Sequence, residues 1–358
     1  MSHPSAAPDA RSLSFSHLIA RADIQFDESK LLGKGGFGAV FKGTRRGGSQ
    51  VAVKRLLPGL TAQSRALFQR EVAIMCSMRS EFVVQVYGVV DDSPDLPVLL
   101  IMELMHQSLH DAYSSLPPPS LSHRVAWLLQ AAQCIDFLHK AGVIHRDIKP
   151  TNMLLTAPDR GSVLKMADFG LSKHLTDITS ASMRSTISST AASAVGTPHY
   201  MAPEILDVLP AYSPASDVFA FGVVCWETIS MKLPYAECVD MHLLKKSIRK
   251  KGLRPPFPGD FPPALRPLIE HAWHSDPAQR PCMQLIVREL ERFLQQLHTG
   301  AQPSSVSDYR CSAPPAPDSR VPASTIAAPP PRFLRRWRGA AGIVDRRPSR
   351  TSRGQRQT

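Results

Sequence analysis

Apolar residues are spaced in two different ways along the chain. Before residue 106 they form short stretches separated by Gly, Asp or Pro turn signals, a pattern typical of strands in an antiparallel sheet. The stretches cover residues 31–32, 40–43, 51–54, 83–90 and 98–105. One helix is expected between them, over residues 62–78, with Leu67, Val72 and Met75 among its apolar positions.

Beyond residue 105 the apolar residues follow the period of a helix. One run that lies on a single helix face consists of Val125, Leu128, Ala132, Ile135 and Leu138. Further helices are expected over residues 215–230, 263–274 and 281–297. The pattern predicts an α+β fold of two lobes, a small β-rich lobe at 23–105 and a larger helical lobe at 106–297. A ligand cleft is most expected where such lobes meet.

The two ends of the chain differ in composition from this folded region. Residues 1–22 and 298–358 have little apolar periodicity and are rich in Pro, Ser, Ala and Arg, which predicts disorder. The formal net charge is +12, but residues 298–358 carry 11 Arg and 3 Asp, so 11 − 3 = +8 of it lies in the tail. The folded region is close to neutral, and a nucleic-acid or membrane partner is therefore considered for the tail alone.

Targeting signals and cysteines bear on where the protein resides. The first 20 residues lack the apolar region of a secretory signal, and no apolar stretch approaches the roughly 20 residues that a membrane-spanning helix needs. The six cysteines include no CxxC pair and no spacing typical of a zinc or disulfide framework. We therefore expect no transmembrane segment and a reducing compartment, the cytoplasm or the nucleus.

A glycine-rich stretch follows the first apolar strand. It consists of Gly33, Lys34, Gly35, Gly36, Phe37, Gly38, Ala39 and Val40. Its glycines allow the backbone to lie close over a polyphosphate, although a flexible hairpin would use the same residues. A dinucleotide-binding turn would open a helix at this point, whereas the following residues are strand-like, so that interpretation is disfavoured.

A lysine and a glutamate extend this first indication. Lys54 ends the apolar stretch 51–54 and is expected to point into the cleft beneath the glycine-rich turn. Glu71 lies in the helix expected at 62–78, where an ion pair to Lys54 would hold the ammonium against nucleotide phosphates. Each alone would equally be a solvated surface residue, so the pair gains weight only from the motifs that follow.

The most specific segment covers residues 145–152 and reads His-Arg-Asp-Ile-Lys-Pro-Thr-Asn. Asp147 is suited to accept a proton from a substrate hydroxyl, and Asn152, five residues later, to supply an amide oxygen to a divalent metal. Asp168, in Asp-Phe-Gly, would then supply the main carboxylate for Mg²⁺, a cation that prefers oxygen ligands and substrate phosphates.

Together, the motifs between Gly33 and Arg280 resemble a eukaryotic protein kinase domain, with every signature present and in order. The details resemble the tyrosine-kinase-like group of serine/threonine kinases. The resemblance implies ATP with Mg²⁺ as the phosphoryl donor and Ser or Thr hydroxyls of protein substrates as acceptors. Lys149 resembles the lysine that contacts the transferred phosphate in serine/threonine kinases.

The same resemblance implies a nucleotide pocket at the junction of the lobes. The residues implied to enclose the adenine ring are Leu32, Val40, Ala52 and Leu155. Met102 would lie at the back of this pocket, and the backbone from Glu103 to Met105 would form the hydrogen bonds of the hinge. For a single apolar residue, plain core packing is the simpler alternative.

After Asp168 the resemblance implies an activation segment that ends at Glu204. In this segment Thr197 would face Asp147, and Glu204 would form a buried ion pair with Arg280. Asp217 is implied to hold the backbone at His145 and Arg146, with a contribution to a helix N-terminus as its alternative.

Residues 179–193 of this segment are dense in Ser and Thr. Arg146, beside the base, would lack a counter-charge that a phosphate supplies. We hypothesise an activating phosphosite, filled by an upstream kinase or by autophosphorylation, against the alternative of a plain polar loop. The candidates are Ser188, Ser189, Thr190 and Ser193.

The basic tail suggests a binding role, and two functions other than an active kinase also remain to be weighed. Residues 332–338 (Arg-Phe-Leu-Arg-Arg-Trp-Arg) combine guanidinium groups with aromatic rings, as in segments that bind acidic lipid, RNA or acidic protein, although a solvated charge run is simpler. A pseudokinase scaffold or a binding protein acting through this tail would also fit the fold. The enzyme is preferred because every residue of the expected site is present. These residues are Lys54, Glu71, Asp147, Asn152 and Asp168.

Overall fold

The structure is a computed structural model. It describes residues 17–35, 38–56, 68, 72, 75–76, 78–93, 95–114, 117–158, 161–168, 198–207 and 211–300. All of them belong to one compact unit, Met1–Cys311. Of the segment predicted to be disordered, residues 1–22, the first 16 lie outside the described residues. Residues 17–22 are described and contact the sheet, since Leu18 bridges to Val89 and Ile19 is buried in a core cluster. The predictions for the Ser/Thr-rich stretch 179–193 and for the tail beyond 300 lie outside the described residues and stay predictions.

The N-terminal part is the expected antiparallel sheet of five strands. In sheet order these are β1 (Ile24–Gly35), β2 (Gly38–Arg45), β3 (Gln50–Leu56), β5 (Leu99–Glu103) and β4 (Val86–Val90). Alternate residues of β3 serve two cores, because Val51 and Val53 pack with Ile101 on one face while Ala52 packs on the other. Burial of both faces explains why this strand is apolar almost throughout.

The helix expected at 62–78 is described at four positions only. Phe68, Val72, Met75 and Cys76 are helical, and all four are buried in the same core cluster as Ala52. Their spacing of three and four residues is that of one helix face, as the sequence predicts. Met78 is not helical, so the helix ends before the predicted boundary.

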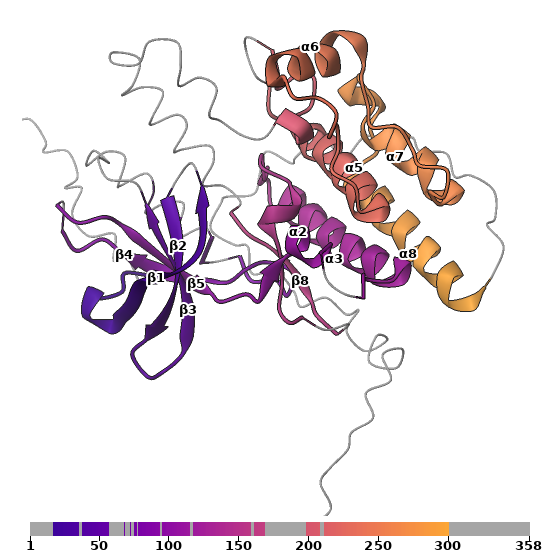
Figure 1. The fold of residues 1–358 in the computed structure, drawn as a ribbon. Helices are drawn as coiled ribbons and strands as arrows, with labels where there is room; N and C mark the ends of the chain where they lie inside the picture. Colours follow the sequence, from indigo (N-terminus) through magenta and orange to yellow (C-terminus); the bar gives the residue numbers. More distant parts are fainter. Residues whose placement is uncertain are drawn as a thin grey trace, which may run out of the picture. The chain divides into compact units, whose positions relative to one another are not determined.

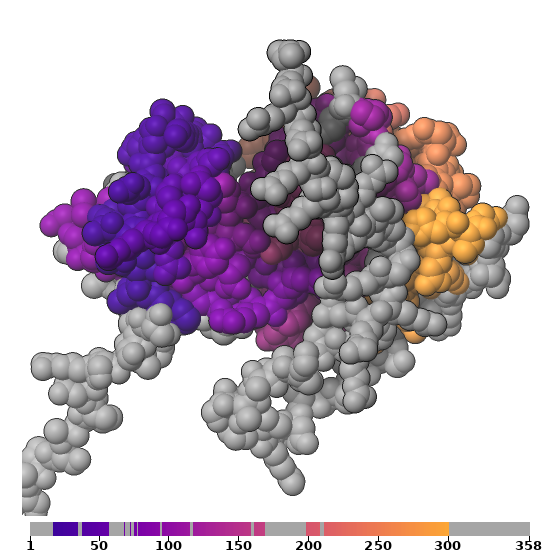
Figure 2. Space-filling view, turned by 90° about the horizontal axis from the view of Figure 1, so that it is seen from below, coloured from indigo at the N-terminus to yellow at the C-terminus, as the bar shows by residue number. Residues whose placement is uncertain are grey.

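The C-terminal part is mainly helical (Figure 1). Its helices are α2 (Leu109–Ala112), α3 (Leu121–Lys140), α5 (Pro214–Ser230), α6 (Met241–Lys251), α7 (Arg266–Ala272) and α8 (Met283–Thr299). Helix α5 is buried along nearly its whole length and packs against α3 and α7, while α8 packs against α3 and keeps its outer face at the surface (Figure 2). The α+β fold with an antiparallel sheet and a helical lobe is therefore confirmed.

Two predictions about these helices need correction. Helix α6 was not predicted, although Met241, Leu244 and Ile248 lie at the spacing of one helix face; it is bounded by Asp240 as N-cap and by Gly252 at a φ of 65°. The helix expected at 263–274 is a 3₁₀ turn, Pro263–Leu265, followed by α7. Proline is accepted at the start of both because its missing N–H has no helical partner there.

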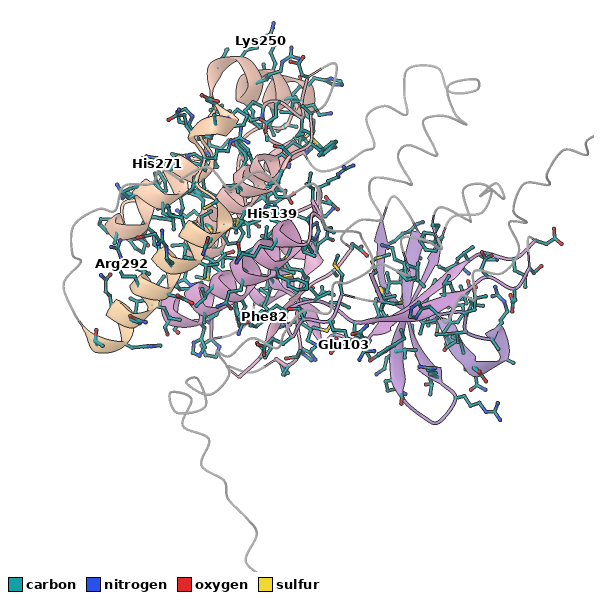
Figure 3. The ribbon with its side chains drawn as sticks, turned by 180° about the vertical axis from the view of Figure 1, so that it is seen from behind. Phe82, Glu103, His139, Lys250, His271 and Arg292 are labelled. Carbon is teal, nitrogen blue, oxygen red and sulfur yellow. The ribbon has the colours of Figure 1, made fainter. Side chains whose placement is uncertain are left out.

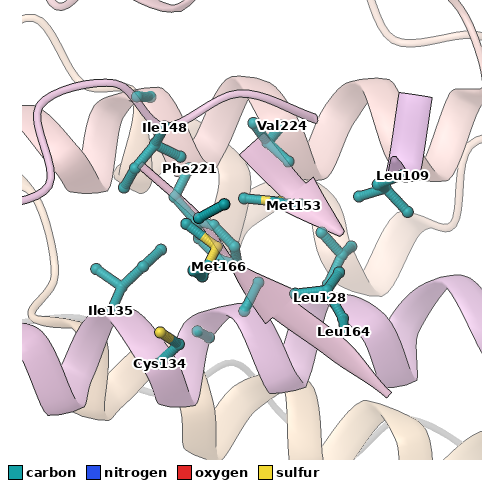
Figure 4. Close-up of a cluster of buried hydrophobic side chains, with 14 of the residues drawn as sticks. Leu109, Leu128, Cys134, Ile135, Ile148, Met153, Leu164, Met166, Phe221 and Val224 are labelled. Atoms are coloured by element: carbon teal, nitrogen blue, oxygen red, sulfur yellow. The ribbon is translucent and has the colours of Figure 1, made fainter. Parts of the chain in front are cut away.

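A second, three-stranded sheet joins the two parts of the molecule. Its strands are β6 (Gln107–Ser108), β7 (Met153–Leu155) and β8 (Leu164–Met166). Met166 donates its backbone N–H to the Phe82 carbonyl at 2.8 Å and accepts from the Val84 N–H at 2.9 Å. The segment before β4 is thereby bonded to β8, and apolar side chains of β7, β8, α3 and α5 meet in one core (Figure 4).

Two further findings concern the membrane and the cysteines. No helix in the described part of the chain has the length and apolar character to cross a bilayer. Cys282 is disulfide-bonded, which the cysteine spacing did not predict. Cys76, Cys134, Cys225 and Cys238 are free thiols.

Candidate functional site

The glycine-rich stretch forms the turn between two antiparallel strands. Gly33 pairs with Val40 and Lys34 with Ala39, so strand β2 and no helix follows the turn. This excludes the dinucleotide-binding alternative. Gly38 has a φ of 148°, and a Cβ there would lie 2.0 Å from the Arg55 carbonyl oxygen, so only glycine fits. Gly36 and Phe37, at the tip, lie outside the described residues.

Lys54 of β3 is buried, with 5% of its surface exposed. Its Nζ lies 2.7 Å from Oδ1 of Asp168, the carboxylate that the sequence assigns to the metal. Burial by itself would raise the pKa of Asp168, but the charge and hydrogen bond of Lys54, with smaller contributions from His145 and Lys149, together hold that pKa below its ordinary value. Glu71, the partner predicted for Lys54, lies outside the described residues.

The apolar residues expected to enclose the adenine ring occupy adjoining strands. Ala52 faces Met102 across the β3–β5 pair, and Val40 faces Lys54 across β2–β3. Leu155 is buried in β7, whereas Leu32 of β1 is 51% exposed.

The hinge expected between Glu103 and Met105 is only partly available for hydrogen bonding to a ligand. The Glu103 N–H donates to the Gln85 carbonyl at 2.9 Å. The predicted hinge hydrogen bonds are therefore limited to the remaining backbone groups of this segment.

Asp147, Lys149 and Asn152 converge on one point. Oδ2 of Asp147 accepts hydrogen bonds from Lys149 Nζ at 2.7 Å and from Asn152 Nδ2 at 2.9 Å. Asn152 Nδ2 also donates to the Asp147 carbonyl at 2.8 Å. Since the amide nitrogen of Asn152 is used in this way, its amide oxygen is left as a ligand.

Asp217 of α5 holds the backbone that leads to Asp147. Its carboxylate, 1% exposed, accepts the N–H of His145 at 2.8 Å and that of Arg146 at 2.9 Å, which confirms the contact implied by the resemblance. His139 of α3 (Figure 3), not predicted, adds a third bond at 2.9 Å through Nε2. Three bonds from neighbouring elements leave this buried carboxylate little freedom to move.

Sequence reasoning missed a lysine that connects the hinge to β8. Lys165 Nζ lies 2.7 and 2.8 Å from the two carboxylate oxygens of Glu103, and Glu103 Oε2 also accepts the Gln85 N–H at 3.2 Å. Glu103 lies where the N-terminal sheet meets the helical part, not far from Phe82 (Figure 3). In the sequence, Lys165 is marked only by lying between two apolar residues of β8. This position does not identify Glu103 as its partner.

The predicted ion pair between Glu204 and Arg280 is present. Arg280 donates from Nη1 to Oε1 at 2.7 Å and from Nη2 to Oε2 at 2.8 Å, in the parallel fork geometry that arginine and carboxylate favour. This pair confirms that the end of the expected activation segment is tied to the helical core. Thr197 lies outside the described residues.

A second carboxylate beneath the same segment was not predicted. Glu227 of α5 is 1% exposed and accepts a hydrogen bond from Tyr200 Oη at 2.6 Å. Burial raises the pKa of Glu227 from 4.5 to about 7, although the Tyr200 hydrogen bond partly opposes this. His110 Nδ1 lies 3.8 Å from its other carboxylate oxygen, and Tyr113 beside it hydrogen-bonds Thr228 at 2.8 Å.

Glu227 is expected to make stability depend on pH. Because its pKa is higher folded than unfolded, the folded state binds the extra proton between pH 4.5 and about 7, so stability should be full below this window and fall as pH rises through it. The loss attributable to this group is ~3 kcal/mol. Denaturant titrations at pH 5 and pH 8 should show it in the wild type and not in Glu227→Gln. Exposed Glu237→Gln serves as the matched control, and parallel pH profiles of wild type and Glu227→Gln would contradict the prediction.

The donors at this site fit a magnesium ion. Asn152 offers an amide oxygen and Asp168 a carboxylate that stays ionised because its pKa is lowered. Mg²⁺ typically takes one or two carboxylates or similar oxygens from the protein and completes its shell with phosphates and water. Among the described residues there is no cluster of three or more His, Cys, Asp or Glu that would form an all-protein metal cage.

Residues 26–290 match the family model described as protein tyrosine and serine/threonine kinase. A probable serine/threonine-protein kinase of Dictyostelium discoideum is 35% identical over 277 residues, covering 76% of this chain and 28% of that protein. Serine/threonine-protein kinase STY17 of Arabidopsis thaliana is 31% identical, with 76% and 45% covered. Dual specificity protein kinase shkC of Dictyostelium discoideum is 32% identical, with 77% and 52% covered. The matched region thus spans about half or less of each of these relatives.

Proposed function

This chain belongs to the protein tyrosine and serine/threonine kinase family, and on that premise we propose that it transfers the γ-phosphoryl group of ATP to serine and threonine hydroxyls of proteins. Use of ATP follows from the family. The observation that best supports activity is the convergence of Lys149 and Asn152 on the Asp147 carboxylate. A pseudokinase has no need to keep all three side chains in hydrogen-bond contact.

Asp147 is the proposed base. Its carboxylate is partly exposed, and it is oriented by two donors on the same oxygen, which leaves the other oxygen to accept the substrate hydroxyl proton. The hydroxyl oxygen then forms its bond to the γ-phosphorus while the bond from that phosphorus to the bridging oxygen breaks, and ADP leaves. The chain supplies orientation and charge for this step and forms no covalent intermediate.

Three cationic groups are proposed to offset the charge of the triphosphate. Lys54 would bind the phosphates from the sheet, and Lys149, next to the base, would bind the group in transfer. Asn152 and Asp168 would hold Mg²⁺, which supplies electrostatic stabilisation of the phosphate oxygens when bound. The glycine-rich turn at residues 33–38 and the pocket residues would cover the nucleotide, with Glu71 as the further partner of Lys54.

Substrates, regulation and location are proposals beyond this activity. We propose protein Ser/Thr acceptors, a phosphosite within 179–193, a cytoplasmic or nuclear location, and contact of the basic tail with acidic lipid, RNA or protein. Dual specificity is a second candidate, because one relative of 32% identity bears that name.

The test is a phosphoryl-transfer assay with the purified full chain. Labelled ATP, Mg²⁺ and a generic basic protein substrate are incubated with wild type and with Asp147→Asn, and the labelled amino acids are identified after hydrolysis. We expect phosphoserine and phosphothreonine from the wild type and almost none from the variant. Added phosphotyrosine would establish dual specificity.

The same assay separates the alternatives. A folded wild type that binds nucleotide without moving phosphate would be a pseudokinase. One that also fails to bind nucleotide would leave the basic tail as the functional part. Equal labelling by wild type and Asp147→Asn would contradict the role of Asp147.

A further inference from the structure

Tyr212 is a residue that the proposed mechanism does not use. It directly precedes Ser213, the N-cap of α5, and is 37% exposed. The Arg146 guanidinium lies over its ring, with Cζ 5.1 Å from the ring centroid. This is within the roughly 6 Å over which a cation is attracted to the negative face of an aromatic ring.

Residue 146 is held from two points at the start of one helix. Asp217, on the first turn of α5, accepts the Arg146 backbone N–H, while Tyr212 contacts the Arg146 side chain. The residue before the N-cap and the fourth residue of a helix lie near each other at the helix start, where hydrophobic residues in these positions often pack together. Here Tyr212 and Asp217 occupy those positions, and Arg146 is bound to both.

The contacts to Arg146 matter because its backbone adopts an unfavourable conformation. Its φ is 69°, in the left-handed region that residues other than glycine seldom adopt. Asp147 comes next in the chain, so a change in the backbone at 146 rotates the carboxylate away from Lys149 and Asn152. Among the described residues no carboxylate forms an ion pair with the Arg146 guanidinium, and the Tyr212 ring is its described contact.

We propose that Tyr212 is a positioning residue, whose ring holds the Arg146 side chain so that the backbone at 146–147 keeps the Asp147 carboxylate in its active orientation. The interaction requires no phosphate, and it therefore acts in the unmodified protein. It rests on the proposed function, in which Asp147 is the base.

Two apolar substitutions at position 212 separate the effect of an aromatic ring from that of an apolar side chain. Tyr212→Phe keeps the aromatic face, whereas Tyr212→Leu keeps an apolar side chain without one. In phosphatase-treated full-length protein, we expect Tyr212→Leu to lower kcat about fivefold with KM for ATP unchanged, and Tyr212→Phe to stay within about twofold of wild type. An NMR signal reports the contact independently, since the ring current should shift the Arg146 side-chain protons in wild type and Tyr212→Phe but not in Tyr212→Leu.

Other results of these measurements would overturn either this proposal or the proposed function. An active wild type with an equally active Tyr212→Leu variant would overturn the proposal, as would equal losses in both variants, which would assign the effect to the hydroxyl group. Loss of thermal stability together with a raised KM for ATP in Tyr212→Leu would make the role structural and would also overturn it. A wild type that moves no phosphate contradicts the proposed function instead, and the NMR shift then still decides whether the ring holds Arg146.

Discussion

Asp147→Asn is expected to lower kcat by about two to four orders of magnitude, the usual contribution of a positioned general base. An amide cannot take the hydroxyl proton, yet its oxygen can still accept the hydrogen bonds of Lys149 and Asn152, so the surrounding loop should keep its shape. KM for ATP should change little because the proposed nucleotide contacts lie on other residues. Steady-state kinetics with varied ATP, at saturating protein substrate, measures both constants.

Asp136→Asn is the matched control. It makes the same chemical change in a carboxylate that pairs with Lys140 one turn away on α3, 2.6 Å apart. Such surface pairs are worth about 0.3–0.5 kcal/mol, so this variant should have wild-type kinetics. If Asp147→Asn kept kcat within tenfold of wild type, Asp147 would act by orienting the substrate and another group would take the proton.

Arg280→Met is expected to lower the free energy of unfolding by about 3–5 kcal/mol. The Arg280 side chain is fully buried, and besides its two bonds to Glu204 it donates to the Ala215 carbonyl at 2.8 Å and the His274 carbonyl at 2.9 Å. Methionine fills much of the volume but leaves a carboxylate without its cation and two carbonyls without donors. Thermal unfolding should show a midpoint roughly 10 °C lower.

Two further variants serve as controls for Arg280→Met. Arg280→Lys keeps the charge but loses the fork, and it should fall between wild type and Arg280→Met. Arg249→Met removes an exposed arginine that lies 3.2 Å from Asp207, and it should cost less than about 1 kcal/mol. Equal midpoints for Arg280→Met and Arg249→Met would show that the buried pair adds no stability beyond a surface pair.

The sequence predicted the strands and helices that are so fully buried that most of their residues must be apolar. Strands β3 and β5 are apolar because they are covered on both faces, and α5 and α3 carry long apolar runs because they form the centre of the helical part. Helix α6 was missed because its apolar face is short, Met241, Leu244 and Ile248, within a segment rich in lysine and arginine. Strands β7 and β8 have three residues each, too few for a period to be visible.

Some residues of the candidate site could also be predicted from the sequence, and others could not. Asp147 and Asn152 were predictable because they lie five residues apart in one motif, and the Glu204–Arg280 pair came from the family resemblance. The Lys165–Glu103 and Tyr200–Glu227 contacts join residues far apart in sequence with no motif of their own. The Lys54–Asp168 contact was likewise not predicted, and the predicted partner Glu71 lies outside the described residues, so that pair stays a prediction.

The 2.7 Å contact between Lys54 and Asp168 couples two of the proposed binding roles. If Lys54 binds the phosphates and Asp168 the metal, as proposed, binding of either ligand alone would separate the pair and leave one of its charges without a partner. Binding of both ligands would give Lys54 and Asp168 each a new counter-charge. We therefore expect ATP and Mg²⁺ to bind with positive cooperativity, a coupling that is reciprocal by thermodynamic necessity.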